Sequence, residues 1–384
     1  MERKSLKRVI ILSSLGLLVT GLGVLVSKAS GFWVFDNTKN EVADVGDITI
    51  PEWTFDNIPD INDVGYYDEF GNKVENIDRK RNYLTFSNTY LVDDGVNTNN
   101  SPIAINYFTV HWVQGHADFQ KVEFPAYYAE RVNGELMIHP VTEIGTGYTF
   151  PNYISNYEAV IAPTVTTIGS KAFYYAQLRG ISFTSENNIE RIESNSFVGV
   201  RFDRSATPFG PKLNYIGSYA FYNCSFDYID LNDIANLETI NYGAFYNCSA
   251  RTIDLSNSNI GTIGNIAFQY CRNATFKMDN LKVKIIGENA FNGDSLSGHI
   301  DLRDSGIERI EAGAFSYLTT DIRQSLTISI PGTIDYIGDS ILLYSQGNIT
   351  VNLYDLSYET ESNFHYYWDY TNNASNIVFN YLNS

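Results

Sequence analysis

Three cysteines are the first residues in this chain that could carry chemistry. Cys224, Cys248 and Cys271 are 24 and 23 residues apart and are the only cysteines of the chain. A row of thiols could bind a metal ion or exchange electrons. Cysteines at equivalent positions of a repeat share one interior environment, however, and there they behave as small hydrophobic side chains. We therefore interpret them as core residues, and their odd number argues against a disulfide framework.

A second candidate is a pair of histidines with a nearby carboxylate. His111, His116 and Asp118 could supply metal ligands from a strand and its turn. No third ligand follows at a spacing typical of zinc sites, so an ordinary strand surface is the favoured interpretation and no metal is predicted. The sequence also contains no nucleophile elbow, phosphate-binding loop or His-Glu-x-x-His motif. We expect a protein that is not an enzyme and needs no cofactor.

The dominant pattern is an Ile-Gly-x-x-Ala-Phe signature that repeats every 23 to 27 residues. Such a period indicates a solenoid of stacked coils, because one unit cannot bury its apolar face alone. Each anchoring isoleucine is followed five residues later by a bulky apolar residue, which is phenylalanine in seven of the eight units. The predicted repeat core is Ile168, Phe173, Ile192, Phe197, Ile216, Phe221, Ile240, Phe245, Ile263, Phe268, Ile286, Phe291, Ile310 and Phe315.

A short alternating segment precedes most anchors by about ten residues, as in Ile229-Asp-Leu231 and Ile253-Asp-Leu255. Period-two alternation predicts a strand with both apolar side chains inward and the residue between them outward. The outward positions form a polar, acid-leaning row, which is either a solvated face or a shallow binding face. Its members are Ser182, Asp230, Asp254, Lys277, Asp301 and Ser329. Exposed acids there should keep ordinary pKa values, so the row suits binding better than catalysis.

The runs Tyr215–Cys224 and Ile328–Gly338 carry a family resemblance. They resemble the BspA-type leucine-rich repeats of bacterial and some protist surface proteins, over about residues 136–384. The resemblance implies a leucine-rich-repeat solenoid of short parallel strands with loop or short-helix return arms. It also implies adhesion to host or matrix proteins or to neighbouring cells, and we expect a monomer.

The repeat departs from its pattern in two units, and both ends of the array have sequences of their own. Ser205–Gly210 replaces a clean strand in the third unit, and the last unit has Ile341 and Leu342 in place of Ala-Phe. Ile138–Gly145 is interpreted as a degenerate first coil or N-terminal cap. The aromatic segment Phe364–Tyr370 and the following Ile377–Phe379 should close the exposed edge of the array.

Residues 1–29 combine a basic start with an apolar run, which is typical of a secretory signal. Cleavage after Ala29 and retention as an uncleaved membrane anchor both remain open. Either places the protein outside the cell or at its surface, with contact to the membrane only through this segment. Residues 30–135 lack the repeat and are predicted to be a small β-rich domain with a partly extended tether. An alternative function is a carbohydrate- or metal-binding module in 30–135, with the repeats as a passive spacer.

The charge of the chain excludes one class of partner. The formal net charge is -18, and without residues 1–29 the chain has 43 acidic and 21 basic side chains. Such a surface repels phosphate backbones, so nucleic acid is not an expected partner.

Overall fold

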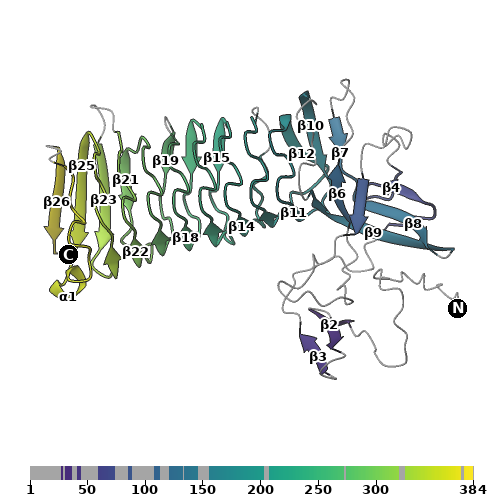
Figure 1. Cartoon of the computed structure of the whole chain (residues 1–384), viewed down its shortest axis with the longest axis horizontal. Coiled ribbons are helices and arrows are strands. Elements are labelled where there is room, and N and C mark those ends of the chain that lie inside the picture. Colours follow the sequence, from purple (N-terminus) through teal and green to yellow (C-terminus); the bar gives the residue numbers. More distant parts are fainter. Residues whose placement is uncertain are drawn as a thin grey trace.

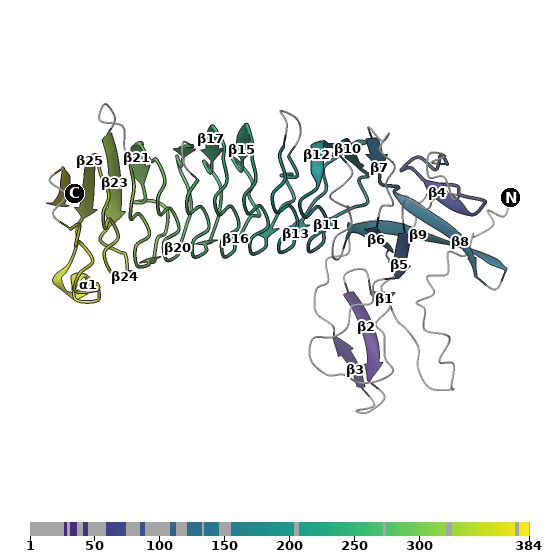
Figure 2. The same cartoon turned by 45° about the horizontal axis from the view of Figure 1, so that its top comes forward.

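The computed structural model describes residues 27–28, 31–36, 41–44, 59–73, 85–88, 108–112, 121–132, 134–145, 155–202, 207–271, 274–319, 325–372 and 376–383. Its repeats stack into an elongated solenoid with one row of strands along each of two opposite edges (Figures 1 and 2). The predicted repeat solenoid is therefore confirmed. The predicted signal segment lies almost entirely outside the described residues.

One row consists of two-residue strands at the anchoring isoleucines, and we call it the anchor sheet. Each strand pairs in parallel with the equivalent strand of the next coil, as in Ile216↔Ile240. The strands are β11 (Thr167–Ile168), β13 (Arg191–Ile192), β14 (Tyr215–Ile216), β16 (Thr239–Ile240), β18 (Thr262–Ile263), β20 (Ile285–Ile286), β22 (Arg309–Ile310) and β24 (Tyr336–Ile337). The sequence predicted only one strand per coil, and these anchor strands were missed.

The opposite row contains the strands that alternation predicted, and it is divided into three parallel sheets. The first has β7 (Lys121–Glu123), β10 (Ser155–Ile161) and β12 (Gln177–Phe183). The second has β15 (Tyr228–Asp230), β17 (Thr252–Asp254) and β19 (Thr275–Lys277). The third has β21 (Gly298–Asp301), β23 (Ser325–Pro331), β25 (Asn348–Tyr354) and β26 (Ile377–Leu382). In the irregular third coil, the described residues contribute only an isolated bridge, Arg201↔Ser225.

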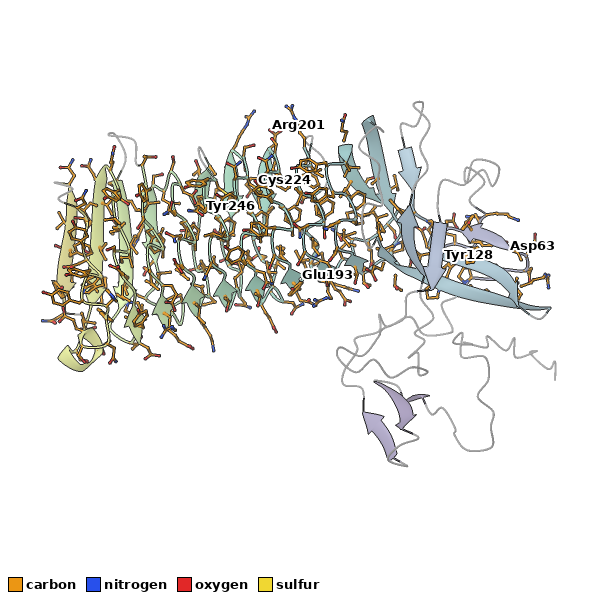
Figure 3. The ribbon with its side chains drawn as sticks, in the orientation of Figure 1. Asp63, Tyr128, Glu193, Arg201, Cys224 and Tyr246 are labelled. Atoms are coloured by element: carbon orange, nitrogen blue, oxygen red, sulfur yellow. The ribbon has the colours of Figure 1, made fainter. Side chains whose placement is uncertain are left out.

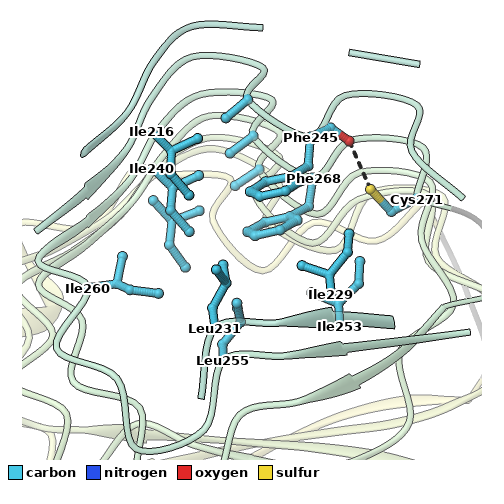
Figure 4. Close-up of a cluster of buried hydrophobic side chains, with 14 of the residues drawn as sticks. Ile216, Ile229, Leu231, Ile240, Phe245, Ile253, Leu255, Ile260, Phe268 and Cys271 are labelled. Carbon is cyan, nitrogen blue, oxygen red and sulfur yellow. Dashed lines mark hydrogen bonds between the residues drawn. The ribbon is translucent and has the colours of Figure 1, made fainter. Parts of the chain in front are cut away.

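The core lies between the two rows and is built from the predicted residues (Figure 4). All seven repeat phenylalanines are fully buried, and so are the anchoring isoleucines. Consecutive phenylalanine rings stack with centroids 5.0 to 5.5 Å apart and planes within 8°. The inward pairs of the alternating strands, such as Ile229 with Leu231, close the core from the other side. The column forms because each coil sets its phenylalanine directly over the previous one.

A turn segment around each phenylalanine joins the anchor strand to the opposite row. Two positions in every turn, two residues before and two after the phenylalanine, have a positive φ, for example Tyr219 (55°) and Asn223 (59°). At these positions the N–H donates to a carbonyl of the next coil, as from Tyr219 to Tyr242 at 3.0 Å and from Asn223 to Tyr246 at 2.9 Å. The turns are therefore bonded coil to coil, and glycine or asparagine suits them best.

Both ends of the array are covered. Ile144 at the end of β9 (Glu135–Ile144) pairs with Ile168, so the segment Ile138–Gly145 does form a first coil in register. At the other end, Ser340 N donates to Tyr367 O and Ile341 N to Trp368 O, which continues the bonding pattern of the turns. The helix α1 (Tyr358–Glu361) precedes this aromatic segment. The aromatic segment therefore lies against the turn of the last coil.

The anchor sheet continues into the N-terminal region. β9 pairs with β6 (Phe108–Trp112), which pairs with β5 (Thr85–Asn88), and β9 also pairs with β8 (Tyr127–Val132). β8 in turn pairs with β4 (Gly65–Tyr67). A separate sheet contains β1 (Ser27–Lys28), β2 (Gly31–Asp36) and β3 (Glu41–Asp44). The predicted domain boundary at 135/136 falls at the first residue of β9, so strand pairing crosses it.

Candidate functional site

The predicted polar row follows the outward side of the opposite row of strands, which we call the strand face, but Asp254 and Ser329 are buried there, so the prediction of an exposed position is wrong for both. Its six residues come from six strands, but these belong to three separate sheets. Asp230, Asp254 and Lys277 are in register on β15, β17 and β19. Asp301 pairs with Ser329 in the third sheet, and Ser182 lies in the first. The row is therefore three local groups rather than one continuous ladder.

Asp254 organises the middle group. It is 7% exposed, so the expectation of an exposed carboxylate is wrong at this position. Tyr228 Oη donates to its Oδ2 at 2.8 Å, and Lys277 Nζ lies 3.4 Å from the same oxygen. Ser256 N donates to Oδ1 at 3.1 Å. The carboxylate is thus held by partners from three coils, with the exposed Tyr228 and Lys277 on the outside.

The third group contains a bidentate ion pair. Arg303 binds Asp301 through Nε–Oδ1 at 2.8 Å and a second nitrogen to Oδ2 at 2.6 Å. Its guanidinium also lies over the ring of Tyr354, 4.9 Å from the centroid. In the same sheet His299 Nε2 is 2.9 Å from the hydroxyl of Ser329, which is fully buried. Pairs of this geometry are well ordered and keep the side chains in one arrangement.

These contacts shift the pKa values of the acids. The pKa of Asp301 falls to about 2, chiefly because Arg303 binds it. Burial raises the pKa of Asp254, but the hydrogen bonds from Tyr228 and Ser256 outweigh this and the net shift is downward. Burial and the bond to Asp254 raise the pKa of Tyr228 to about 12. The prediction of ordinary pKa values is wrong for these two acids, and both are charged acceptors rather than proton donors at neutral pH.

The cysteines are buried and free, which agrees with the core interpretation. The thiols of Cys224 and Cys248 donate to the carbonyls of Phe197 and Phe221, each at 2.8 Å. Cys271 donates to Phe245 at 3.0 Å, as Figure 4 shows. Burial raises the pKa of Cys248 and of Cys271 well above the ordinary value. Buried thiols in this state are poor nucleophiles and metal ligands.

The candidate metal ligands of the N-terminal region are only partly placed. His111 is in β6, while His116 and Asp118 lie outside the described residues. Within the described ranges, no group of three or more His, Cys, Asp or Glu residues is arranged to hold a metal ion. In the same ranges no helix has the length and apolar character needed to cross a bilayer. The alternative function for 30–135 stays a prediction.

One surface group was missed by the sequence reasoning. Five tyrosines cluster on the turn segments of three consecutive coils, and we call this group the tyrosine patch: Tyr219, Tyr222, Tyr242, Tyr246 and Tyr270. It lies on the flank between the two rows of strands, where Figure 3 marks Tyr246. The spacing offers a signal for it, because tyrosines directly before or after a buried phenylalanine in these turns should point outward.

The sequence model described as "BspA type Leucine rich repeat region" matches residues 134–208 and 211–350, with six copies. Comparison with curated proteins finds no match. Among solved structures, a leucine-rich repeat protein from Bacteroides ovatus is 16% identical with a TM-score of 0.43, covering 79% of this chain and 66% of that chain. The matched part of this chain thus corresponds to just under two thirds of the length of that protein.

Two further solved structures are similar to the chain. A leucine rich cell surface protein from Faecalibacterium prausnitzii is 17% identical with a TM-score of 0.34, covering 65% of this chain and 72% of that one. The pneumococcal vaccine antigen PcpA is 14% identical with a TM-score of 0.31, covering 78% and 97%.

Proposed function

Because this chain belongs to the BspA type leucine-rich repeat family, we propose that it is a secreted or cell-surface protein whose solenoid is a non-enzymatic platform for protein binding and adhesion. The basic and apolar residues 1–29 support export. The partners are proteins of a host, of the extracellular matrix or of neighbouring cells. A solenoid suits this role because it presents extended surfaces to large partners.

The middle group of the strand face carries the proposal. Tyr228 is 38% exposed, and its hydroxyl is fixed by Asp254, which also holds Lys277. Tyrosine is enriched at protein interfaces, and a side chain that is already fixed loses less entropy on binding. Exposed Asp230 adds negative charge beside the group, whereas Asp227 is paired with Arg251 at 3.7 Å. We therefore place the contact on β15, β17 and β19 and expect a basic partner surface.

The test uses the full chain as bait against extracts of host cells and extracellular matrix, followed by direct affinity measurement with the captured protein. Tyr228→Ala and Asp230→Lys should each weaken binding, because the first removes an exposed ring and the second reverses a negative charge that would face the basic partner. Tyr317→Ala is the matched control, since Tyr317 is 50% exposed on a turn segment away from this face. Asp254 is unsuitable as a probe because its buried carboxylate supports the local fold.

The possible results distinguish the proposed contact surface from the proposed function as a whole. Loss of affinity in the two strand-face variants, with the control unchanged, supports the proposal. Equal affinity in all variants removes the strand face from consideration. Failure of the full chain to capture any protein, together with its absence from the cell surface in a protease-shaving experiment on intact cells, overturns the proposed function itself.

A further inference from the structure

The tyrosine patch differs in composition from the rest of the surface. Turn segments 217–225, 241–249 and 264–271 contain no Asp, Glu, Lys or Arg, although these residues make up 18% of the chain. Their outward side chains are tyrosine, asparagine, glutamine and serine, with one isoleucine, Ile266, at the position equivalent to Tyr219. The equivalent turns on either side contain charges, such as Glu193 and Glu288. The patch is therefore a neutral, aromatic and amide-rich area on an acidic protein.

The rings form one connected group along the solenoid axis. Tyr219 lies 5.8 Å from Tyr222 and 5.3 Å from Tyr242, measured between ring centroids. Tyr222 and Tyr270 each lie 5.6 Å from Tyr246, on opposite sides of it. Tyr242 is 47% exposed and the others are half-buried. Solvent thus reaches ring surface in three successive coils.

Part of this arrangement costs backbone strain. Tyr219 and Tyr270 have φ values of 55° and 65°, a region that suits glycine or asparagine far better than a bulky side chain. Each ring lies over the glycine of the next coil, since an added Cβ would be 2.6 Å from Tyr219 at Gly243 and 2.6 Å from Tyr270 at Gly293. Because Tyr317 and Tyr344 have similar φ values of 55° and 56°, this backbone conformation is common to the turns, and the proposal depends on the composition and ring contacts of the patch.

An amide rim borders the rings. Asn247 Nδ2 donates to Asn223 Oδ1 at 2.9 Å, and both side chains are exposed. Amides and hydroxyls both donate and accept hydrogen bonds, so they can pair with a ligand's hydroxyl groups without any charge. Aromatic faces, in turn, cover apolar C–H surface. Pyranose sugars present these two features together, an apolar ring face and a rim of hydroxyls.

We propose that the tyrosine patch binds a neutral polysaccharide chain lying along the solenoid axis. The length of the patch over three coils fits an extended polymer better than a single sugar. The absence of basic residues within it, on a chain of net charge -18, disfavours sulfated or phosphorylated glycans. This surface is separate from the strand face, and the inference does not depend on protein binding there.

The test measures binding of the full chain to cello-, xylo-, malto- and mannohexaose and to a soluble neutral β-glucan by calorimetry, with heparin as the anionic comparator. We expect at least one neutral glycan to bind. The double variant Tyr242→Ala/Tyr246→Ala should bind it about tenfold more weakly, as expected for loss of central aromatic contacts. Tyr246→Phe, which keeps the ring, should retain most of the affinity.

The matched control is Tyr317→Ala/Tyr344→Ala. These tyrosines have centroids 5.1 Å apart and are 50% and 47% exposed, but their turns contain Glu311 or Asp339. Unchanged glycan affinity in this control supports the proposal, provided that all variants unfold at similar temperatures. Three results overturn it: no neutral glycan binds, both double variants lose affinity equally, or the patch variant loses only a protein partner or heparin.

Discussion

Replacing Phe245 with alanine tests whether the phenylalanine column holds the coils together. The ring is fully buried in the middle of the column. Its centroid lies 5.0 Å from that of Phe221 and 5.2 Å from that of Phe268, with nearly parallel planes. The backbone cannot collapse to fill the gap, because Phe245 N donates to Ala267 O at 2.7 Å and Phe221 N to Ala244 O at 2.7 Å.

The magnitude follows from burial and cavity formation. Truncating a fully buried phenylalanine lowers the free energy of unfolding by about 3–5 kcal/mol. Two stacking contacts are lost as well, and each aromatic pair contributes about 0.5–1.5 kcal/mol beyond its buried area. Because a backbone held on both sides relaxes little, we expect a value in the upper half of the first range. Phe245→Leu, which leaves a smaller cavity, should cost less.

The assay is equilibrium urea unfolding followed by far-ultraviolet circular dichroism. Phe70→Ala is the control for loss of a phenylalanine as such, since Phe70 is 73% exposed, and it should change the unfolding free energy by less than about 0.5 kcal/mol. A decrease of less than about 1 kcal/mol in the unfolding free energy of Phe245→Ala would contradict this prediction, because removing a ring from a rigid, fully buried column must leave a cavity.

Three further predictions concern the ion pair, the turns and the thiols. Arg303 lowers the pKa of Asp301 from 3.8 to about 2 in the folded state, so the pair stabilises the fold above about pH 4 and this is lost as the pH falls through about 2. Asp301→Asn should therefore flatten the pH dependence of unfolding in that window by about 0.5 kcal/mol, the usual size for an exposed pair. Gly243→Ala should lower the free energy of unfolding by about 1–2 kcal/mol because of the positive φ, and by a further amount because the new Cβ clashes with the Tyr219 ring. Tyr219→Ala should remove the second contribution, and Gly134→Ala, which has a positive φ but no neighbour within 4 Å, should show only the first. Equal losses at both glycines in urea unfolding would exclude the clash. The three buried cysteines should react with an aromatic disulfide reagent only in denaturant, and rapid reaction of the native protein at pH 8 would show that the thiols are accessible.

The periodic residues made the core predictable. An Ile and a Phe at fixed spacing in seven units specify which side chains face inward, and each of these side chains is buried in the structure. The anchor strands were not predictable by alternation, because a two-residue strand such as Ile285–Ile286 is too short to show an alternating pattern of apolar and polar residues. They form because identical backbone positions of neighbouring coils meet in register.

The surface was harder to predict than the core. Alternation predicts an outward, exposed Asp254, but it could not show that Tyr228 and Lys277 would cover the carboxylate. Those contacts join residues 26 and 23 positions apart and depend on the exact stacking of coils. The tyrosine patch was missed for a related reason. The positive φ at Tyr219, which helps to orient its ring, is set by a hydrogen bond to the next coil and is not indicated by the residue type.

The parallel stacking of coils also determines how the molecule responds to a pull along its axis. The hydrogen bonds between coils run along this axis, so the coil boundaries are in series: each bears the full load, and they separate one at a time. Releasing one 24-residue coil provides about 80 Å of slack chain. In the proposed adhesive role the chain would act as a tether that lengthens in steps, and a force–extension record of the full chain should show a series of small, evenly spaced drops.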